Sequence, residues 1–174
     1  MSIQIQKIAV VLMIVVYILS AAAATVSAVS TPTEYGRTDE KVSHPHFDRS
    51  TFAIIRGDGT RFSFKAKVAA SGKAQAYGLM FVRSMPDDQG MIFLSASPKP
   101  VTFWMKNTLI PLDILFVRPD GVLSWIKAEA RPQDETPIYS QGPVSAVIEI
   151  NGGLAKKYGL SAGDKVKSPA IKVQ

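Results

Sequence analysis

The chain has 174 residues, with 20 basic and 14 acidic side chains, two histidines and no cysteine. Without cysteine there is no disulfide, no thiol nucleophile and no thiolate metal site. The basic residues are scattered and do not form arginine-rich runs interleaved with aromatics, so a nucleic-acid partner is not expected. A chain of this length can bury the core of one domain without covalent staples.

Residues 1–28 have the pattern of a secretory signal. Lys7 is the only charged residue before Glu34, and an apolar run from Ile8 to Leu19 precedes a stretch rich in alanine. A positive start, an apolar core and small residues at a cleavage site are typical of exported proteins. We therefore expect a periplasmic or extracellular protein. The alternative is an uncleaved membrane anchor over residues 8–26, a segment just long enough to span a bilayer.

Residues 29–50 are expected to be a polar spacer, followed by a single globular domain over residues 51–174. Runs rich in β-branched and aromatic residues predict the strands of this domain, and glycine-containing turns indicate that two pairs of them form hairpins. In chain order the predicted strands are 51–56 paired with 61–68, then 91–94, 101–107, 114–117 paired with 122–128, 144–150 and 165–167.

Two short helices are predicted. Ser71 is a suitable N-cap for the first, which is expected to run to about Arg83 and to bury a stripe formed by Ala74, Tyr77, Gly78 and Phe81. The second covers residues 154–158 and ends at Gly159. Because tight turns join most strands, we expect an α+β, predominantly β fold. It would be a compact, mainly antiparallel sheet or small barrel with two short helices.

Three blocks of sequence together resemble the uncharacterised family called domain of unknown function 192. In order, they are GLMFVR (78–83) with GMIF (90–93), FWMKNT (103–108) with PLD (111–113), and VIEINGG (147–153) with Gly163-Asp164. The resemblance spans about residues 52–168. It implies a compact β-rich domain, frequently exported or tethered to a membrane, with no established activity and no catalytic residues to transfer.

The segment from Phe103 to Asp113 is the best candidate for a ligand-binding surface. If residues 101–107 form a regular strand, Trp104 and Lys106 share one face, away from Phe103, Met105 and Asn107. An exposed indole beside a cation can hold a sugar ring or an acidic group, although Lys106 could simply cover Trp104. The candidate ligand-binding residues are Trp104, Lys106, Asn107, Asp113, Arg83 and Glu149.

Asp113 lies in an apolar run, so its carboxylate needs partners. Lys106, Arg83, Asn107 or the amides near Thr108 could supply them, in which case Asp113 would brace the loop that follows residue 107. The alternative is catalytic: two carboxylates about 5–10 Å apart can hydrolyse a glycosidic bond. Under that hypothesis, Asp113 and Glu149 would make the protein a small hydrolase of an envelope polymer.

A third hypothesis concerns Met80, Met91 and Met105, whose thioethers could carry Cu(I) in an exported protein. Methionines also fill irregular gaps in cores, which is their usual role. His44 and His46 offer only two ligands and make a poor metal site. We therefore expect no metal and no cofactor. The sequence favours an exported non-catalytic binding or interaction module whose partner is a small molecule, a glycan or an envelope protein.

Overall fold

The computed structural model describes residues 44–173. The predicted signal or anchor and most of the predicted spacer lie outside the described residues. Within the described part of the chain, no helix combines the length and apolar character needed to cross a membrane. The first strand begins at Asp48, slightly before the domain boundary expected at residue 51.

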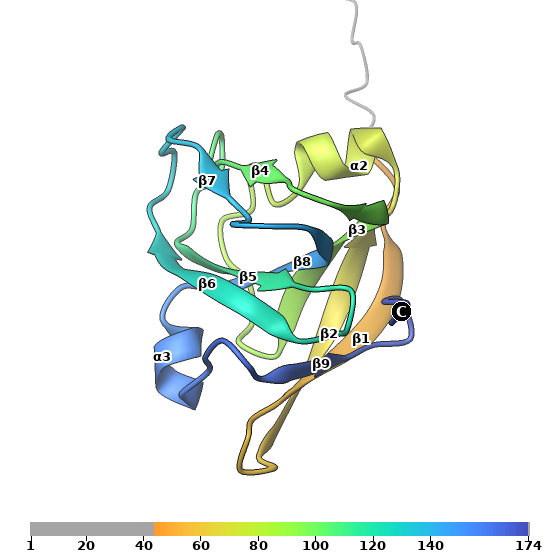
Figure 1. Cartoon of the computed structure of the whole chain (residues 1–174). Coiled ribbons are helices and arrows are strands. Elements are labelled where there is room, and N and C mark those ends of the chain that lie inside the picture. The colour runs from red at the N-terminus through yellow and green to blue at the C-terminus, as the bar shows by residue number, and fades with distance from the viewer. Residues whose placement is uncertain (1–43, 174) are drawn as a thin grey trace, which may run out of the picture. The chain divides into compact units, whose positions relative to one another are not determined.

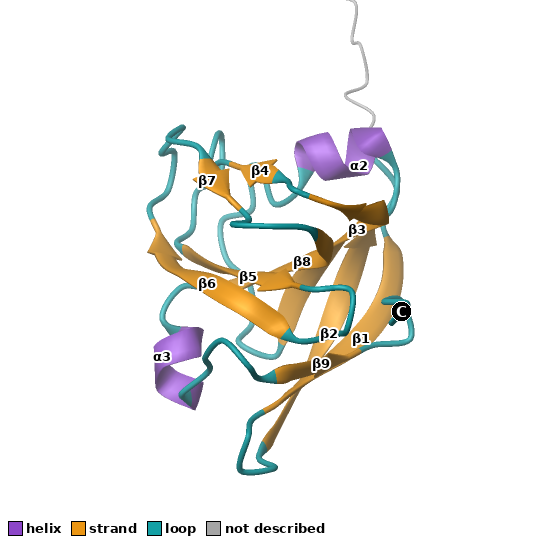
Figure 2. Cartoon of the chain, viewed as in Figure 1, coloured by secondary structure: helices purple, strands orange, loops and turns teal. Residues whose placement is uncertain are grey.

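A seven-stranded sheet curls into a half-barrel and forms the frame of the domain (Figures 1 and 2). Every neighbouring pair of strands is antiparallel except β2 and β3, which are parallel. The predominantly β, mainly antiparallel fold predicted from the sequence is confirmed. The strand order is β6 (Leu123–Ala130), β5 (Leu112–Val117), β8 (Val144–Asn151), β3 (Gln89–Lys99), β2 (Arg61–Ala69), β1 (Asp48–Ile55) and β9 (Lys165–Lys167).

The two edges of the sheet meet, which completes the curl. Val122, just before β6, forms a bridge with Lys165 of β9, and Val166 donates a backbone hydrogen bond to Gly121 (2.7 Å). Inside the curl, alternate apolar residues of the strands pack into one core, among them Phe52, Ile92 and Leu115. The short helix α3 (Leu154–Tyr158) buries Leu154 and Ala155 in the same core.

A second core lies on the outer face of β3, β8, β5 and β6, where α2 (Gly72–Tyr77) and the two-stranded sheet of β4 (Thr102–Phe103) and β7 (Ile138–Tyr139) cover it. Figure 1 shows α2, β4 and β7 together at one end of the molecule. Met91, Phe93 and Phe116 belong to this second core. Among residues 44–173, no helix or second sheet covers the outer face of β2, β1 and β9 in this way.

Helix α2 is shorter than the sequence predicts. Ser71 is its N-cap, as expected, and its hydroxyl accepts a hydrogen bond from the amide of Ala74 (3.2 Å). The helix ends at Tyr77 because Gly78 adopts a positive φ of 50°, which a continuing helix does not allow. Phe81 therefore leaves the predicted buried stripe and is 56% exposed. Arg83, the expected end of the helix, lies outside it.

The predicted strand 101–107 is also largely replaced by a turn. Only Thr102–Phe103 is a strand, and the chain turns at Lys106–Asn107, where Asn107 has a φ of 55°. Asparagine tolerates this left-handed conformation better than most residues. The partner strand β7 was not predicted at all, because two residues within a polar loop carry too little pattern to detect.

Gly90 is needed where β3 approaches β8. A Cβ at this position would lie 2.6 Å from the carbonyl oxygen of Glu149, a fixed backbone atom. We expect Gly90→Ala to lower the free energy of unfolding by about 1–3 kcal/mol, because the two strands must separate. Gly72→Ala is the control: its Cβ meets nothing within 4 Å, so urea unfolding should show unchanged or slightly higher stability. Equal stability of both variants would contradict the close approach.

Candidate functional site

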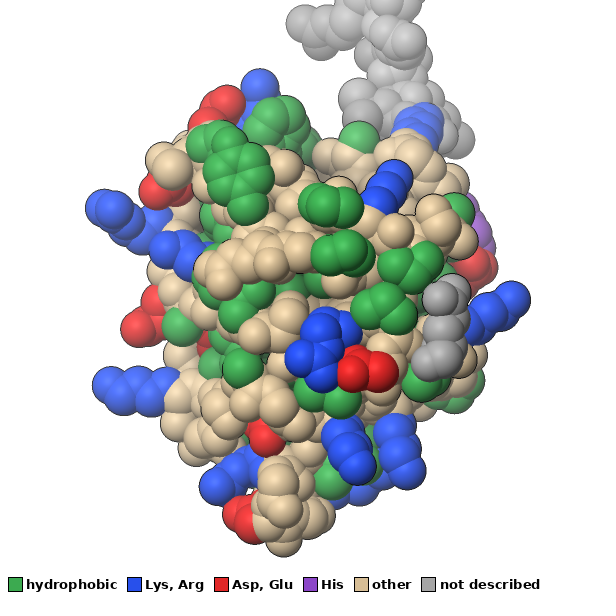
Figure 3. Space-filling view, in the orientation of Figure 1, with side chains coloured by type: hydrophobic (Ala, Val, Ile, Leu, Met, Phe, Trp, Pro, Cys, Tyr) green, Lys and Arg blue, Asp and Glu red, His purple; other side chains and the backbone are tan. Residues whose placement is uncertain are grey.

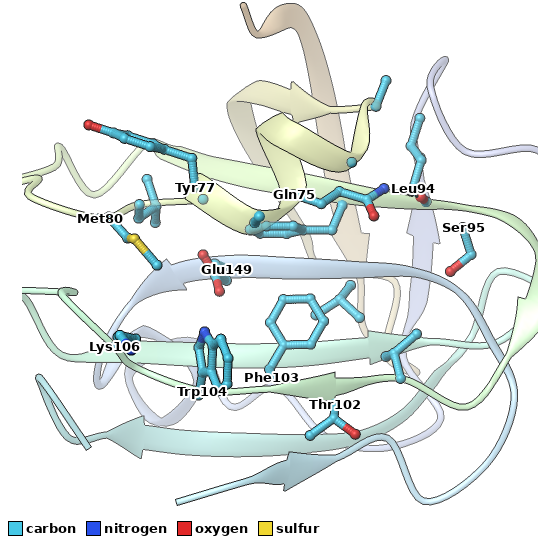
Figure 4. A pocket seen from close by; sticks show the side chains of 18 of the residues that line it. Gln75, Tyr77, Met80, Leu94, Ser95, Thr102, Phe103, Trp104, Lys106 and Glu149 are labelled. Atoms are coloured by element: carbon cyan, nitrogen blue, oxygen red, sulfur yellow. Dashed lines mark hydrogen bonds between the residues drawn. The ribbon is translucent and has the colours of Figure 1, made fainter. Parts of the chain in front are cut away.

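A pocket of about 600 Å³ opens between α2, β3, β4 and β8 (Figure 4). Its walls come from Gln75–Met80, from the middle of β3 and from Thr102–Trp104, and Val147 and Glu149 of β8 also line it. Of the six candidate site residues, the structure brings three to this pocket: Trp104, Lys106 and Glu149.

Glu149 reaches the pocket because of its register in the sheet. It lies opposite Met91 of β3 and Ile114 of β5, so its side chain points to the outer face with theirs. Figure 4 shows the carboxyl group projecting from β8 into the pocket. The residue is only 4% exposed, and its Oε2 atom is buried without a hydrogen-bond partner among the described residues.

Burial determines the protonation state of Glu149. Removing the carboxyl from water disfavours its charged form and raises its pKa from 4.5 to about 8. At neutral pH the group is therefore mainly a neutral acid, with one O–H donor and two acceptor oxygens. A polar group of this kind, directed into a pocket and unpaired, can form a hydrogen bond with a bound molecule.

Trp104 and Lys106 lie at the pocket as a pair. The Nζ atom of Lys106 is 5.9 Å from the centre of the indole ring, a distance that allows a cation–π contact. Lys106 also lies 3.7 Å from a carboxylate oxygen of Glu135. The lysine does not cover the tryptophan completely, because Trp104 remains 53% exposed. Trp104 and Lys106 therefore lie together as predicted, although a turn places them there and not the predicted strand. The predicted separation from Phe103 is wrong, because Phe103 lines the same pocket.

Among the residues that line the pocket but were not predicted as ligand-binding candidates, three are notable for their contacts or their burial. Phe103 lines it and packs edge-on against Phe93, with ring centres 5.0 Å apart. The amide of Gln75 donates to the carbonyl oxygen of Leu94 (2.6 Å) and ties α2 to β3. Thr108 is buried and also lines the pocket. Phe103 could have been inferred from its place beside Trp104, whereas nothing in the sequence marks the other two.

Asp113 is a structural brace rather than a pocket residue. It is fully buried and accepts backbone hydrogen bonds from Glu129 (2.7 Å), Gly153 (3.1 Å) and Ala155 (2.6 Å). The carboxylate thus joins β6 to the start of α3. Asp113 is a brace, as predicted, but it does not brace the loop that follows residue 107, and its partners differ from those predicted. They lie far along the chain, and none is Lys106, Arg83, Asn107 or an amide near Thr108.

Asp113 and Glu149 point to opposite faces of the sheet. Asp113 lies opposite Ile150, whereas Glu149 lies opposite Ile114, the next residue of β5. Neighbouring residues of a strand project from opposite faces. The first carboxylate therefore faces the interior of the half-barrel and the second faces the pocket. They cannot flank one glycosidic bond, and the hydrolase hypothesis based on this pair is wrong.

Asn107 and Arg83 do not line the pocket. Both side chains are exposed. Asn107 instead supports its neighbours: its amide nitrogen lies 3.8 Å from the sulfur of Met80, and its carbonyl oxygen accepts a hydrogen bond from Phe81 (2.9 Å). These contacts join the turn after β4 to the segment after α2, so Asn107 shapes the pocket without reaching it.

The methionines have different surroundings. Met80 lines the pocket, whereas Met91 and Met105 are fully buried in the outer core. Burial of the latter two matches the packing role that methionine commonly has. The Cu(I) hypothesis stays a prediction. Among residues 44–173, no group of three or more His, Asp or Glu side chains is arranged to hold a metal ion.

The chain is thus a small β-rich half-barrel domain with a pocket beside α2. The chain belongs to the family called domain of unknown function 192, described as "Uncharacterized ACR", whose model matches residues 53–168. The resemblance drawn from the three sequence blocks is thereby confirmed. A comparison with curated proteins finds no match.

Two solved structures are similar to this domain. One, from Sinorhizobium meliloti 1021, is provisionally described as a transcription regulator; it has 34% identity and a TM-score of 0.70, and the match covers 72% of this chain and 97% of that one. The other is a protein of unknown function from Novosphingobium aromaticivorans DSM 12444, with 45% identity, a TM-score of 0.66, and coverage of 72% and 88%. Both of those chains consist largely of this domain, so in those two proteins it forms nearly the whole solved structure.

Proposed function

We propose that the protein is an exported, non-catalytic binding module that takes a small organic ligand into the pocket between α2, β3, β4 and β8. The observation that carries the proposal is the buried Oε2 atom of Glu149, which has no hydrogen-bond partner among residues 44–173 and lies in a pocket whose wall includes the exposed ring of Trp104. An unsatisfied buried polar atom costs about 1–3 kcal/mol, so its retention favours a functional reason.

The surroundings of Glu149 restrict the ligand. Lys99 and Lys106 are the other charged residues lining the pocket, so the pocket carries positive charge when Glu149 is protonated. A ligand with hydrogen-bond acceptors, either neutral or acidic, suits this environment better than an amine. The faces of Trp104 and Phe103 favour a ring or an apolar body in the same molecule. A single carboxyl without a second catalytic group supports binding rather than catalysis.

The proposed location outside the cytoplasm follows from the sequence. The apolar run 8–19, the lysine before it and the alanines after it favour export, with or without retention of the segment as an anchor. An envelope sugar or organic acid is then an accessible ligand. A glycan-bearing or protein partner would need to present such a group to the pocket.

A thermal-shift screen of the domain (residues 44–174) tests the proposal. The probes are neutral sugars, amino sugars, and aromatic and aliphatic carboxylates, and a binder must raise the melting temperature. We expect a shift with a ring-bearing carboxylate or a sugar, and about tenfold weaker affinity in Trp104→Ala. Amino sugars should bind less well than neutral or acidic ones.

The matched control is Tyr139→Ala. Tyr139 is another exposed aromatic, 63% exposed, and it does not line this pocket. Its replacement should leave the affinity for the probe unchanged. Equal losses in Trp104→Ala and Tyr139→Ala, or no shift with any probe class, would contradict a ligand site at this pocket.

A further inference from the structure

The outer face of β2, β1 and β9 carries a cluster of basic side chains. Strand register places them on one face: Arg49 lies opposite Lys67, Ile55 lies opposite both Arg61 and Lys165, Ala53 lies opposite Lys167, and Thr51 lies opposite Lys65. Residues paired in this way share a face of the sheet. We call this cluster the basic face and define it by Arg49, Arg61, Lys65, Lys67, Lys165 and Lys167.

All six of these side chains are exposed, and the face is poor in acid. Of these six residues, only Lys65 has a salt bridge to another described residue, Asp88, at 2.9 Å. Figure 3 shows Lys and Arg side chains along the lower part of the molecule, where Figure 1 places these strands. The spacing of strands and residues gives the face dimensions of roughly 10 by 20 Å.

The like charges of the basic face lower the stability of the domain when no partner is bound. Arg49 and Lys67 are like charges placed directly opposite each other on neighbouring strands, a pairing that is normally destabilising. Protection of a sheet edge would require only a few charges of either sign. Six charges of one sign on a single face instead match a partner of the opposite charge.

The basic face also has a hollow of about 620 Å³. Arg61, Lys65 and Lys167 line it together with the hydroxyl-bearing residues Thr51, Ser63 and Ser168. One acid, Asp88, also lines the hollow and pairs with Lys65, so Arg61 and Lys167 are its two cations without a salt bridge among the described residues. Cations combined with hydroxyl groups are suited to a phosphate. A phosphate group could therefore enter the face while the remaining cations lie over neighbouring charges.

We propose that the basic face docks on an anionic phospholipid bilayer, with a lipid phosphate in the hollow lined by Arg61, Lys65 and Lys167. A bilayer matches a broad, nearly one-signed face better than a single soluble anion does, because all six cations contribute together. The chain enters the face at β1, and the apolar segment predicted over residues 8–26 precedes β1 by a short stretch of sequence. The basic face and the ligand pocket are formed by different residues.

Vesicle co-sedimentation of the domain (residues 44–174) tests the proposal. Vesicles of phosphatidylcholine alone are compared with vesicles that also contain phosphatidylglycerol. We expect binding only to the second kind, and loss of binding near 1 M salt, where the screening length is about 3 Å. Each cation near an anionic surface contributes about fivefold in affinity, so Arg61→Gln with Lys167→Gln should weaken binding about 25-fold.

The control pair, Lys127→Gln with Lys156→Gln, makes the same change in net charge on exposed residues of β6 and α3. It should change the affinity by less than about twofold, because these residues lie outside the basic face. Four outcomes would overturn the proposal: equal weakening by both pairs, no dependence on phosphatidylglycerol, survival of binding at high salt, or binding of inorganic phosphate without binding to vesicles. Melting temperatures of both pairs verify that the fold is intact.

Discussion

Asp113→Ala is expected to lower the free energy of unfolding by about 4 kcal/mol. The substitution leaves three backbone amides, those of Glu129, Gly153 and Ala155, without their acceptor at a fully buried position. Each orphaned amide costs about 1–3 kcal/mol, and the costs do not add completely. Small domains have about 5–15 kcal/mol of stability in total, so this loss would remove about a quarter to four-fifths of it. Urea titration followed by tryptophan fluorescence measures the loss.

Asp164→Ala provides the comparison. Asp164 is also buried, but its carboxylate accepts only one backbone hydrogen bond from a described residue, from Ser161 at 2.8 Å. We expect a loss of about 1–2 kcal/mol for this variant. If both variants lost the same amount, or if Asp113→Ala changed stability by less than about 1 kcal/mol, the bracing role of Asp113 would be refuted.

The local features of the fold could be predicted because their causes are local. Gly59 and Gly121 adopt positive φ in the two hairpin turns, and glycine in a turn between apolar runs is visible in the sequence. The N-cap Ser71 and the glycine that ends α3 belong to the same class. The C-terminal end of α2 also has a local cause, because the positive φ of Gly78 stops the helix.

The pairing of distant segments could not be predicted in this way. Nothing in the sequence of Gln89–Lys99 shows that this strand lies parallel to β2. Nor does the sequence around Asp113 show that its carboxylate accepts hydrogen bonds from the amides of residues 129, 153 and 155. These partners depend on closure of the half-barrel. The separation of Asp113 from Glu149 likewise follows from register between β5 and β8, which no single strand contains.

The sequence names Glu149 only as a candidate ligand-binding residue and as a possible catalytic partner of Asp113, whereas its burial can be seen only in the structure. The strand pattern alone would allow the carboxyl to reach water. In the structure, β3, β5 and the cover of the outer core keep water from the carboxyl of Glu149. Among the described surroundings, the pocket is the only place where this carboxyl can meet a polar group. The candidate site thus became recognisable only when the cover contributed by α2 and β4 was known.

Replacing Glu149 by glutamine is expected to stabilise the protein, and the gain should depend on pH. The folded-state pKa of Glu149 is about 8, above the ordinary value of 4.5. Between these pH values unfolding releases a proton, so this residue makes the wild-type protein less stable as the pH rises from about 4.5 to about 8. Glutamine has no such proton. The free energy of unfolding of Glu149→Gln should exceed that of the wild type by about 3 kcal/mol more at pH 7 than at pH 4.5.

Glu135→Gln is the matched control, because it makes the same chemical change at an exposed carboxylate near Lys106. It removes no buried carboxyl and should not reproduce the stabilisation expected of Glu149→Gln. Parallel stability curves for the wild type and Glu149→Gln between pH 4.5 and 8 would show that the carboxyl is not a buried neutral acid. The expected gain measures how much stability the buried carboxyl of Glu149 costs the folded protein at neutral pH. A hydrogen bond from the proposed ligand to this carboxyl would offset part of that cost, which is why the proposed binding site centres on Glu149.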